Sequence, residues 1–129
     1  MPWFHIHRPI DTTKLSRDPD EAQKIRDDKL MHSRISLHLA TQLLSQGRWA
    51  MDQARRVNLP TLIAYGRSDA MIDTSACHHL AIRMGDHASE ASWPEMQHDL
   101  LHDLDRQQVI EHLIAWLDET YPRESDDPV

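Results

Sequence analysis

The chain has 129 residues, 40% of them hydrophobic, and its 14 basic and 21 acidic residues give a formal net charge of −7. This length suits one modest domain, and the acidic balance argues against nucleic acid or an anionic membrane surface as a partner, because both are bound through basic patches. The lone cysteine allows no internal disulfide. Because no signal-peptide pattern and no apolar run of about 20 residues is found, we expect a cytoplasmic protein without a transmembrane segment.

The first predicted element is a short helix that follows an irregular stretch. Residues 1–15 contain two prolines and a cluster of turn-forming polar residues, which predicts a loop. Asp18 can cap a helix, and Pro19 suits the first helical position, where the amide that proline lacks would have no partner. We therefore expect a helix from Asp18 to about Lys29.

The clearest helical pattern in the chain covers residues 34–56. Its apolar residues recur at a spacing that gathers them on one face, which predicts that this face is buried. The expected members of the face are Ile35, Leu39, Leu43, Ala50, Ala54 and Val57. Gly47 lies inside the pattern and is a candidate break between two helical pieces.

Beyond residue 60, strands and helices are predicted to alternate. The run over 61–65 is short, apolar and bounded by proline and glycine, as is typical of a buried strand. The elements expected after it are a helix over 75–84, a weaker strand over 88–93 and a final helix over 104–119. An alternation of this kind predicts a parallel sheet with flanking helices.

Polar residues follow both predicted strands, at the points where parallel sheets carry their functional loops. The first loop is Gly66-Arg67-Ser68-Asp69, and the second, which begins at Pro94, contains His98. His98 lies 29 residues after Asp69, a separation that suits a strand end, a helix and a returning strand. We expect this acid and this histidine to meet at one edge of the sheet.

The two loops resemble the acid and histidine loops of α/β-hydrolases. The segments that carry the resemblance are Pro60-Thr61-Leu62-Ile63-Ala64-Tyr65-Gly66-Arg67-Ser68-Asp69 and His98-Asp99-Leu100-Leu101 with the helix that follows it and contains Trp116-Leu117. Upstream, Leu15-Ser16-Arg17-Asp18-Pro19 and Asp28-Lys29-Leu30-Met31-His32 resemble the end of the cap in the monoacylglycerol lipase and lysophospholipase group, which is serine aminopeptidase S33-like. The similarity covers roughly residues 15–118.

The resemblance implies catalytic roles for two residues. His98 matches the general base that takes the proton of a serine nucleophile and later returns it to the leaving group. Asp69 matches the acid that orients the imidazole and stabilises its charged form. The implied reaction is hydrolysis of carboxylic esters, of the monoacylglycerol or lysophospholipid type, without a cofactor or a metal.

The nucleophile motif of the family, Gly-x-Ser-x-Gly, is absent from these residues, whose only glycines are Gly47, Gly66 and Gly85. Without the serine no acyl-enzyme forms, so we expect the chain alone to be inactive on the lipid-like ester. Two strands also leave open sheet edges and apolar faces, which predicts a complementing N-terminal hydrolase half, a homodimer or marginal stability. The alternative is a non-catalytic protein-interaction domain derived from a hydrolase.

The expected fold is therefore α/β: the C-terminal part of an α/β-hydrolase, with two parallel strands and flanking helices, preceded by cap-type helices. Residues 1–57 would form the cap-like segment and linking helix. Residues 58–121 would form the C-terminal βαβα part, and residues 122–129 a frayed tail.

Simpler interpretations stay open for several polar residues. Asp69 also suits a plain turn, and Asp73 competes with it for the acid role, although Asp73 better suits a helix cap. Cys77 is more typical of a small buried residue than of a nucleophile. Trp3 and Phe4 fit either an acyl pocket or a core. Histidine pairs raise the alternative of a metal site, without an array typical of zinc. These pairs are His5 with His7, His78 with His79, and His98 with His102.

Overall fold

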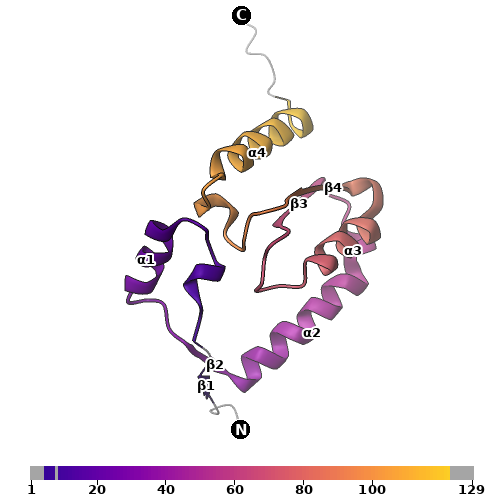
Figure 1. The fold of residues 1–129 in the computed structure, drawn as a ribbon. Coiled ribbons are helices and arrows are strands. Elements are labelled where there is room, and N and C mark those ends of the chain that lie inside the picture. Colours follow the sequence, from indigo (N-terminus) through magenta and orange to yellow (C-terminus); the bar gives the residue numbers. More distant parts are fainter. Residues whose placement is uncertain (1–4, 8, 123–129) are drawn as a thin grey trace, which may run out of the picture.

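Two small sheets and four α-helices make up the part of the chain that the structure describes, residues 5–7 and 9–122 of a computed structural model (Figure 1). β1 (His5–His7) and β2 (Arg34–Ser36) are antiparallel, whereas β3 (Thr61–Gly66) and β4 (Ala88–Trp93) are parallel. The helices are α1 (Pro19–Asp27), α2 (Leu37–Gln53), α3 (Thr74–Met84) and α4 (Arg106–Thr120). The expected α/β class with two parallel strands is confirmed.

The N-terminal helix begins as predicted. The Asp18 side chain accepts a hydrogen bond from the Asp20 amide at 3.0 Å, and Pro19 occupies the first helical position. A cap of this type satisfies an amide that would otherwise lack a partner in the first turn. α1 ends at Asp27, slightly before the expected Lys29.

The pairing of β1 with β2 corrects two predictions. Residues 34–36 were expected to start a helix and residues 5–7 to lie in a loop, but the two segments pair as antiparallel strands. The reason is local: the Ser36 hydroxyl accepts a hydrogen bond from the Leu39 amide at 3.1 Å, so Ser36 is the cap and the helix starts after it. The β-branched Ile35 just before the cap suits a strand.

α2 runs through Gly47 without a break, so the candidate interruption there is wrong. Its predicted apolar face is also largely uncovered: Leu39 is 50% exposed and Leu43 is 60% exposed. Only Ala54 of the expected face is buried, and it lies in the 3₁₀ turn η2 (Ala54–Arg56) that extends the helix. The spacing thus identifies a helix, whereas burial needs a partner surface that the described residues do not supply.

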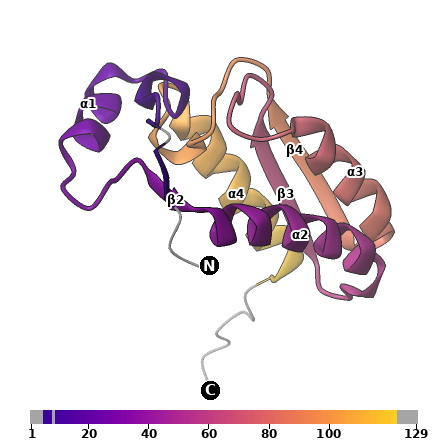
Figure 2. The same cartoon turned by 90° about the horizontal axis from the view of Figure 1, so that it is seen from below.

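The second half follows the predicted order of strand, helix, strand and helix. β3 and β4 lie in register with Ala64 opposite Ala91 and Gly66 opposite Trp93. α3 packs on both strands. Figures 1 and 2 show α2 and α3 on one side of this sheet and α4 on the other, which is the layering expected of a parallel sheet. The C-terminal ends of β3 and β4 therefore lie at the same edge.

Among the residues whose burial is described, the apolar core is small and rich in alanine. Its members are Leu15, Ala22, Ala54, Ala81, Met84, Ala91, Met96 and Val109. Burial of alanine removes little apolar area from water, so these residues contribute modestly to stability. In contrast, Leu44 is 71% exposed and Trp49 is 60% exposed. None of the helices within residues 5–7 and 9–122 is long and apolar enough to cross a membrane.

The structural predictions for the two ends of the chain lie outside the described residues. These are the roles of Trp3 and Phe4 and the fraying of the tail from residue 123 onward.

Candidate active site

Asp69 lies in the turn that follows β3, and its side chain is only 2% exposed. One carboxylate oxygen, Oδ1, accepts hydrogen bonds from the backbone amides of Met71 and Ile72, at 2.6 and 3.2 Å. Two amide donors fix the orientation of the carboxylate, because rotation would leave both unpartnered. The second oxygen, Oδ2, is therefore aimed in a set direction.

That direction is the ring of His98, which follows β4. His98 Nδ1 lies 2.8 Å from Asp69 Oδ2, a length typical of a strong hydrogen bond. When Nδ1 donates to a carboxylate, the neutral ring keeps Nε2 as its acceptor. The His98 side chain is 42% exposed, so Nε2 has access to an incoming group.

The two loops are joined by their backbones as well as by this pair. The Ser68 amide donates to the Met96 carbonyl at 3.1 Å, and the Ser68 hydroxyl donates to the Pro94 carbonyl at 2.8 Å. A Cβ at Gly66 would overlap the carbonyls of Met96 and Gln97. Glycine at this position thus allows the histidine loop to approach the acid loop.

A hollow of about 570 Å³ adjoins His98. Its lining is mostly apolar, with contributions from the N-terminal region and from the acid loop. The residues are Ile10, Leu15, Ile25, Asp28, Met31, Met71, His98 and Asp99. An imidazole at the edge of an apolar hollow can act on a substrate that carries a hydrocarbon chain.

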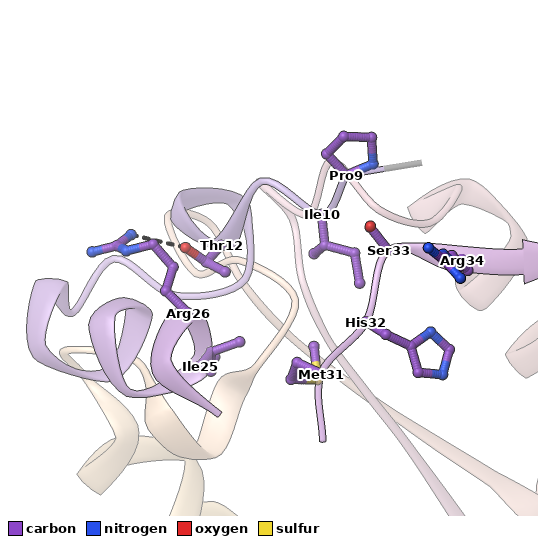
Figure 3. Close-up of a pocket in the computed structure, with 9 residues that line it drawn as sticks. All are labelled: Pro9, Ile10, Thr12, Ile25, Arg26, Met31, His32, Ser33 and Arg34. Atoms are coloured by element: carbon purple, nitrogen blue, oxygen red, sulfur yellow. Dashed lines mark hydrogen bonds between the residues drawn. The ribbon is translucent and has the colours of Figure 1, made fainter. Parts of the chain in front are cut away.

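A second hollow, of about 350 Å³, shares Ile10, Ile25 and Met31 with the first. Figure 3 shows these three side chains gathered at its centre. Arg26 lies beyond them, where its guanidinium donates to the Thr12 hydroxyl at 2.8 Å. The apolar surface next to His98 therefore continues away from the histidine between α1 and the strand β2.

The competing residues have other roles. Asp73 caps α3 by accepting a hydrogen bond from the Ser75 amide at 3.0 Å, as the alternative interpretation predicted. Burial raises the pKa of the Cys77 thiol, and the nearby carboxylates of Asp69 and Asp73 raise it further, which keeps the thiol protonated at neutral pH. Within residues 5–7 and 9–122, no group of three or more His, Cys, Asp or Glu side chains is arranged to hold a metal ion.

Two charged residues beside the site were not singled out from the sequence. Asp103 is completely buried, and Arg17 donates to its carboxylate from Nε at 2.7 Å. They lie 86 residues apart, so spacing alone gives no sign that they meet. The available signal was the Leu15-Ser16-Arg17-Asp18-Pro19 segment, whose resemblance to a cap end marks it as more than a linker.

Comparisons with known proteins identify related chains. A family model described as serine aminopeptidase, S33, matches residues 1–105. A monoacylglycerol lipase of Mycolicibacterium smegmatis is 20% identical over 110 residues, which cover 84% of this chain and 39% of that protein. An uncharacterised abhydrolase domain-containing protein of Dictyostelium discoideum is 24% identical over 121 residues, which cover 92% of this chain and 13% of that protein.

The fold has a solved counterpart. The crystal structure of the Paleococcus ferrophilus monoacylglycerol lipase superimposes with a TM-score of 0.83 at 21% identity, over 91% of this chain and 46% of that one. The chain thus spans less than half the length of each of these three proteins. Because the family model covers most of the sequence, the chain belongs to the serine aminopeptidase S33 family of α/β-hydrolases.

Proposed function

We propose that this chain supplies the acid and the base of a serine hydrolase site that acts on carboxylic esters, with Asp69 as the acid and His98 as the base. The observation that carries the proposal is the 2.8 Å contact between His98 Nδ1 and the buried Asp69 carboxylate. In a triad this contact fixes the tautomer that leaves Nε2 free to accept a proton.

The reaction would run in two halves. His98 Nε2 takes the proton of a serine hydroxyl as the serine oxygen attacks the ester carbonyl, and the proton then passes to the departing alkoxide. In the second half, His98 takes a proton from water, whose oxygen attacks the acyl-enzyme, and the proton returns to the serine as the fatty acid leaves. Asp69 stabilises the imidazolium in both halves without being protonated itself.

The substrates that suit this site are monoacylglycerols or lysophospholipids. Support comes from the apolar hollow beside His98, lined by residues such as Ile10, Met31 and Met71. It also comes from the similarity to two proteins named as monoacylglycerol lipases. In this proposal residues 1–57 act as the cap and linking helix over the 58–121 part.

The serine would come from outside these residues, because they contain no Gly-x-Ser-x-Gly. A complementing N-terminal hydrolase half is the partner that fits best. The same absence supports a second candidate function, a non-catalytic interaction domain that keeps the hydrolase fold for binding.

The test is reaction with a fluorophosphonate probe together with turnover of a p-nitrophenyl acyl ester. Both are measured for the chain alone and after mixing with the polypeptide encoded immediately upstream. We expect no turnover by the chain alone, and serine labelling with turnover in the mixture. Asp69→Asn should then lower the rate by about 10⁴-fold, the effect of losing the correct tautomer in a Ser-His-Asp triad.

His102→Ala is the matched control for His98→Ala. His102 lies four residues further along, and its ring contacts Asp99 rather than Asp69. Loss of activity in the His98 variant alone would support the proposal. Turnover by the unmixed chain would contradict the need for a second polypeptide, and absence of labelling in every mixture would favour the interaction domain.

A further inference from the structure

The histidine loop is fastened to the segment before α1 by a buried carboxylate. Asp103 lies five residues after His98, and its side chain is 0% exposed. Its Oδ1 accepts hydrogen bonds from Arg17 Nε at 2.7 Å and from the Leu104 amide at 2.7 Å. Arg17 Nη2 also lies 2.6 Å from the same oxygen. A carboxylate buried this deeply is expensive unless it is well paired, as this one is.

The other oxygen of Asp103 points back toward His98. Oδ2 accepts from the Arg17 amide at 3.3 Å and, at a longer 3.5 Å, from the amide of Gln97, the residue directly before His98. One carboxylate thus touches the backbone next to the histidine and the segment that leads into α1. Any shift of Asp103 would be passed to the histidine through a single residue.

Arg17 contacts both ends of the histidine loop. Its Nη2 lies 2.6 Å from Asp105, and its Nη1 lies 3.3 Å from Glu95. Because the guanidinium is planar and presents its donors in a fixed fork, these contacts set the spacing between the two ends of the loop. Figure 2 shows the region before α4 beside the N-terminal region that leads to α1.

Neighbouring residues strengthen the same junction. The Ser16 hydroxyl donates to the His102 carbonyl at 2.7 Å, and the Asp99 amide donates to the Leu15 carbonyl at 2.8 Å. Both bonds join the segment before α1 to residues that follow His98. Polar contacts to the residues that follow the histidine are therefore a substantial part of the junction.

The charges at this junction are mutually stabilised. Burial alone raises the pKa of the Asp103 carboxyl, but the hydrogen bonds and charge of Arg17 outweigh it and leave the pKa below its ordinary value. The hydrogen bonds from Arg17 to Asp103 and Asp105 likewise raise the pKa of the guanidinium. The pair is thus fully charged at neutral pH.

We propose that Arg17 and Asp103 are positioning residues, which hold the histidine loop so that His98 Nδ1 meets Asp69. The inference rests on the proposed function for its catalytic meaning. The positioning itself is a property of this chain alone. Arg17 and Asp103 act through the loop backbone and touch neither the substrate nor the reacting atoms.

The test follows the His98 ring by NMR in the chain as it is, with ¹⁵N-labelled histidine. In the unmodified protein, Nδ1 should carry the proton bonded to Asp69, protected from exchange with water. Arg17→Gln should raise the exchange rate of this proton by about tenfold, the factor that corresponds to losing roughly one hydrogen bond. Arg17→Lys keeps the positive charge but not the fixed arrangement of guanidinium donors, so it should give a smaller increase in this exchange rate.

Lys24→Gln is the matched control, because it also removes one positive charge, from a side chain that is 69% exposed and pairs with Glu21 at 2.7 Å. It should leave the His98 proton unchanged. A purely structural role would lower the melting temperature in the Arg17 variants with the His98 signal of the folded protein unaltered, and that result would overturn the proposal. If Arg17→Gln does not fold, Arg17→Lys decides by the same criterion.

The outcome is separable from that of the ester assay. A change at His98 in the Arg17 variants supports positioning even if no mixture hydrolyses an ester. Where a mixture is active, the variants should lower kcat more than they change KM, because Arg17 does not itself line the apolar hollow beside His98.

Discussion

The histidine loop and helix α2 are held in different ways. The histidine loop is fixed to the segment before α1 by buried polar groups, with Asp103 completely enclosed and paired to Arg17. On α2, apolar side chains such as Leu44 and Trp49 are left 71% and 60% exposed. The comparison shows that the geometry of the candidate site is specified within the chain, whereas much of the apolar surface is not covered by the described residues.

This difference matches the extent of the chain relative to its relatives. It covers 46% of the Paleococcus ferrophilus lipase structure, and the matched part keeps the fold with a TM-score of 0.83. A partial sheet can therefore hold the acid and the histidine together through loop contacts. Hydrogen bonds and ion pairs fix that geometry, but the area removed from water supplies most of the folding free energy.

The substitution expected to disturb the candidate site most is one that adds a side chain at Gly66. Valine there would overlap the backbone carbonyls of Met96 and Gln97, which cannot rotate away as a flexible side chain could. We expect Gly66→Val to lower the free energy of unfolding by about 1–3 kcal/mol or more, as overpacking does, and to separate Asp69 from His98. Urea unfolding and the His98 ring signal report the two effects.

Gly47→Ala is the control for that substitution. A Cβ at Gly47 would meet nothing within 4 Å, and the residue lies inside α2. Alanine in a helix is more favourable than glycine, so this variant should gain about 0.5–1 kcal/mol. Equal stability of the two variants would contradict the close approach at Gly66.

Local signals in the sequence were enough to predict the second half, and together with the resemblance to α/β-hydrolases they predicted that Asp69 and His98 meet. Asp18 and Asp73 are caps that can be recognised from the residues that follow them, and both act as predicted. β3 is an apolar run between proline and glycine. Asp69 and His98 were predicted to meet because strand ends in a parallel sheet share an edge, and they lie 2.8 Å apart.

The rest depends on pairings between distant residues. β4 has weak strand propensity because it contains no β-branched residue. Its Glu90 carboxylate is nevertheless used: Tyr65 donates to it at 2.5 Å and His78 Nδ1 lies 2.9 Å from it. The pairing of β1 with β2 joins segments far apart in sequence, and so does the contact of Arg17 with Asp103. Neither contact produces a periodic pattern in the sequence, because each involves only a few residues.

Lowering the pH tests the ion pair between Asp103 and Arg17 without changing a residue. Because the folded-state pKa of Asp103 is lowered, its contribution to stability is complete above the unfolded value of about 4 and is lost as the pH falls through the folded value. We expect the midpoint of urea unfolding to fall steeply below about pH 4. Other carboxyls with a lowered pKa contribute to the same loss of stability at low pH, namely Asp11, Asp73 and Glu90.

Asp103→Asn measures how much the Asp103 carboxyl contributes to the pH dependence of stability. The variant should be less stable at neutral pH and should lose less stability between about pH 5 and pH 2 than the unmodified chain, because the titrating group is gone. Asp86→Asn, at an exposed position in the 3₁₀ turn after α3, should leave the profile unchanged. Parallel profiles for the Asp103 variant and the unmodified chain would show that the buried carboxylate does not contribute.

The smallest effect on stability is expected on the apolar side. Leu44→Gln replaces an exposed side chain on α2 and should change the free energy of unfolding by no more than about 0.5 kcal/mol. Its effect should instead be on association, because an exposed apolar patch is favourable to bury against another surface. If a second copy covers α2, sedimentation of the variant should show a weaker dimer. If an N-terminal hydrolase half covers it, the variant should need more of that partner to reach full ester turnover.

Gln46→Asn, on the same helix, is the control and should alter neither the sedimentation nor the ester turnover. A monomeric Leu44 variant with a much lower free energy of unfolding would mean that Leu44 already packs within the chain. The contrast between a histidine loop fixed by the chain itself and an uncovered apolar face on α2 would then be wrong.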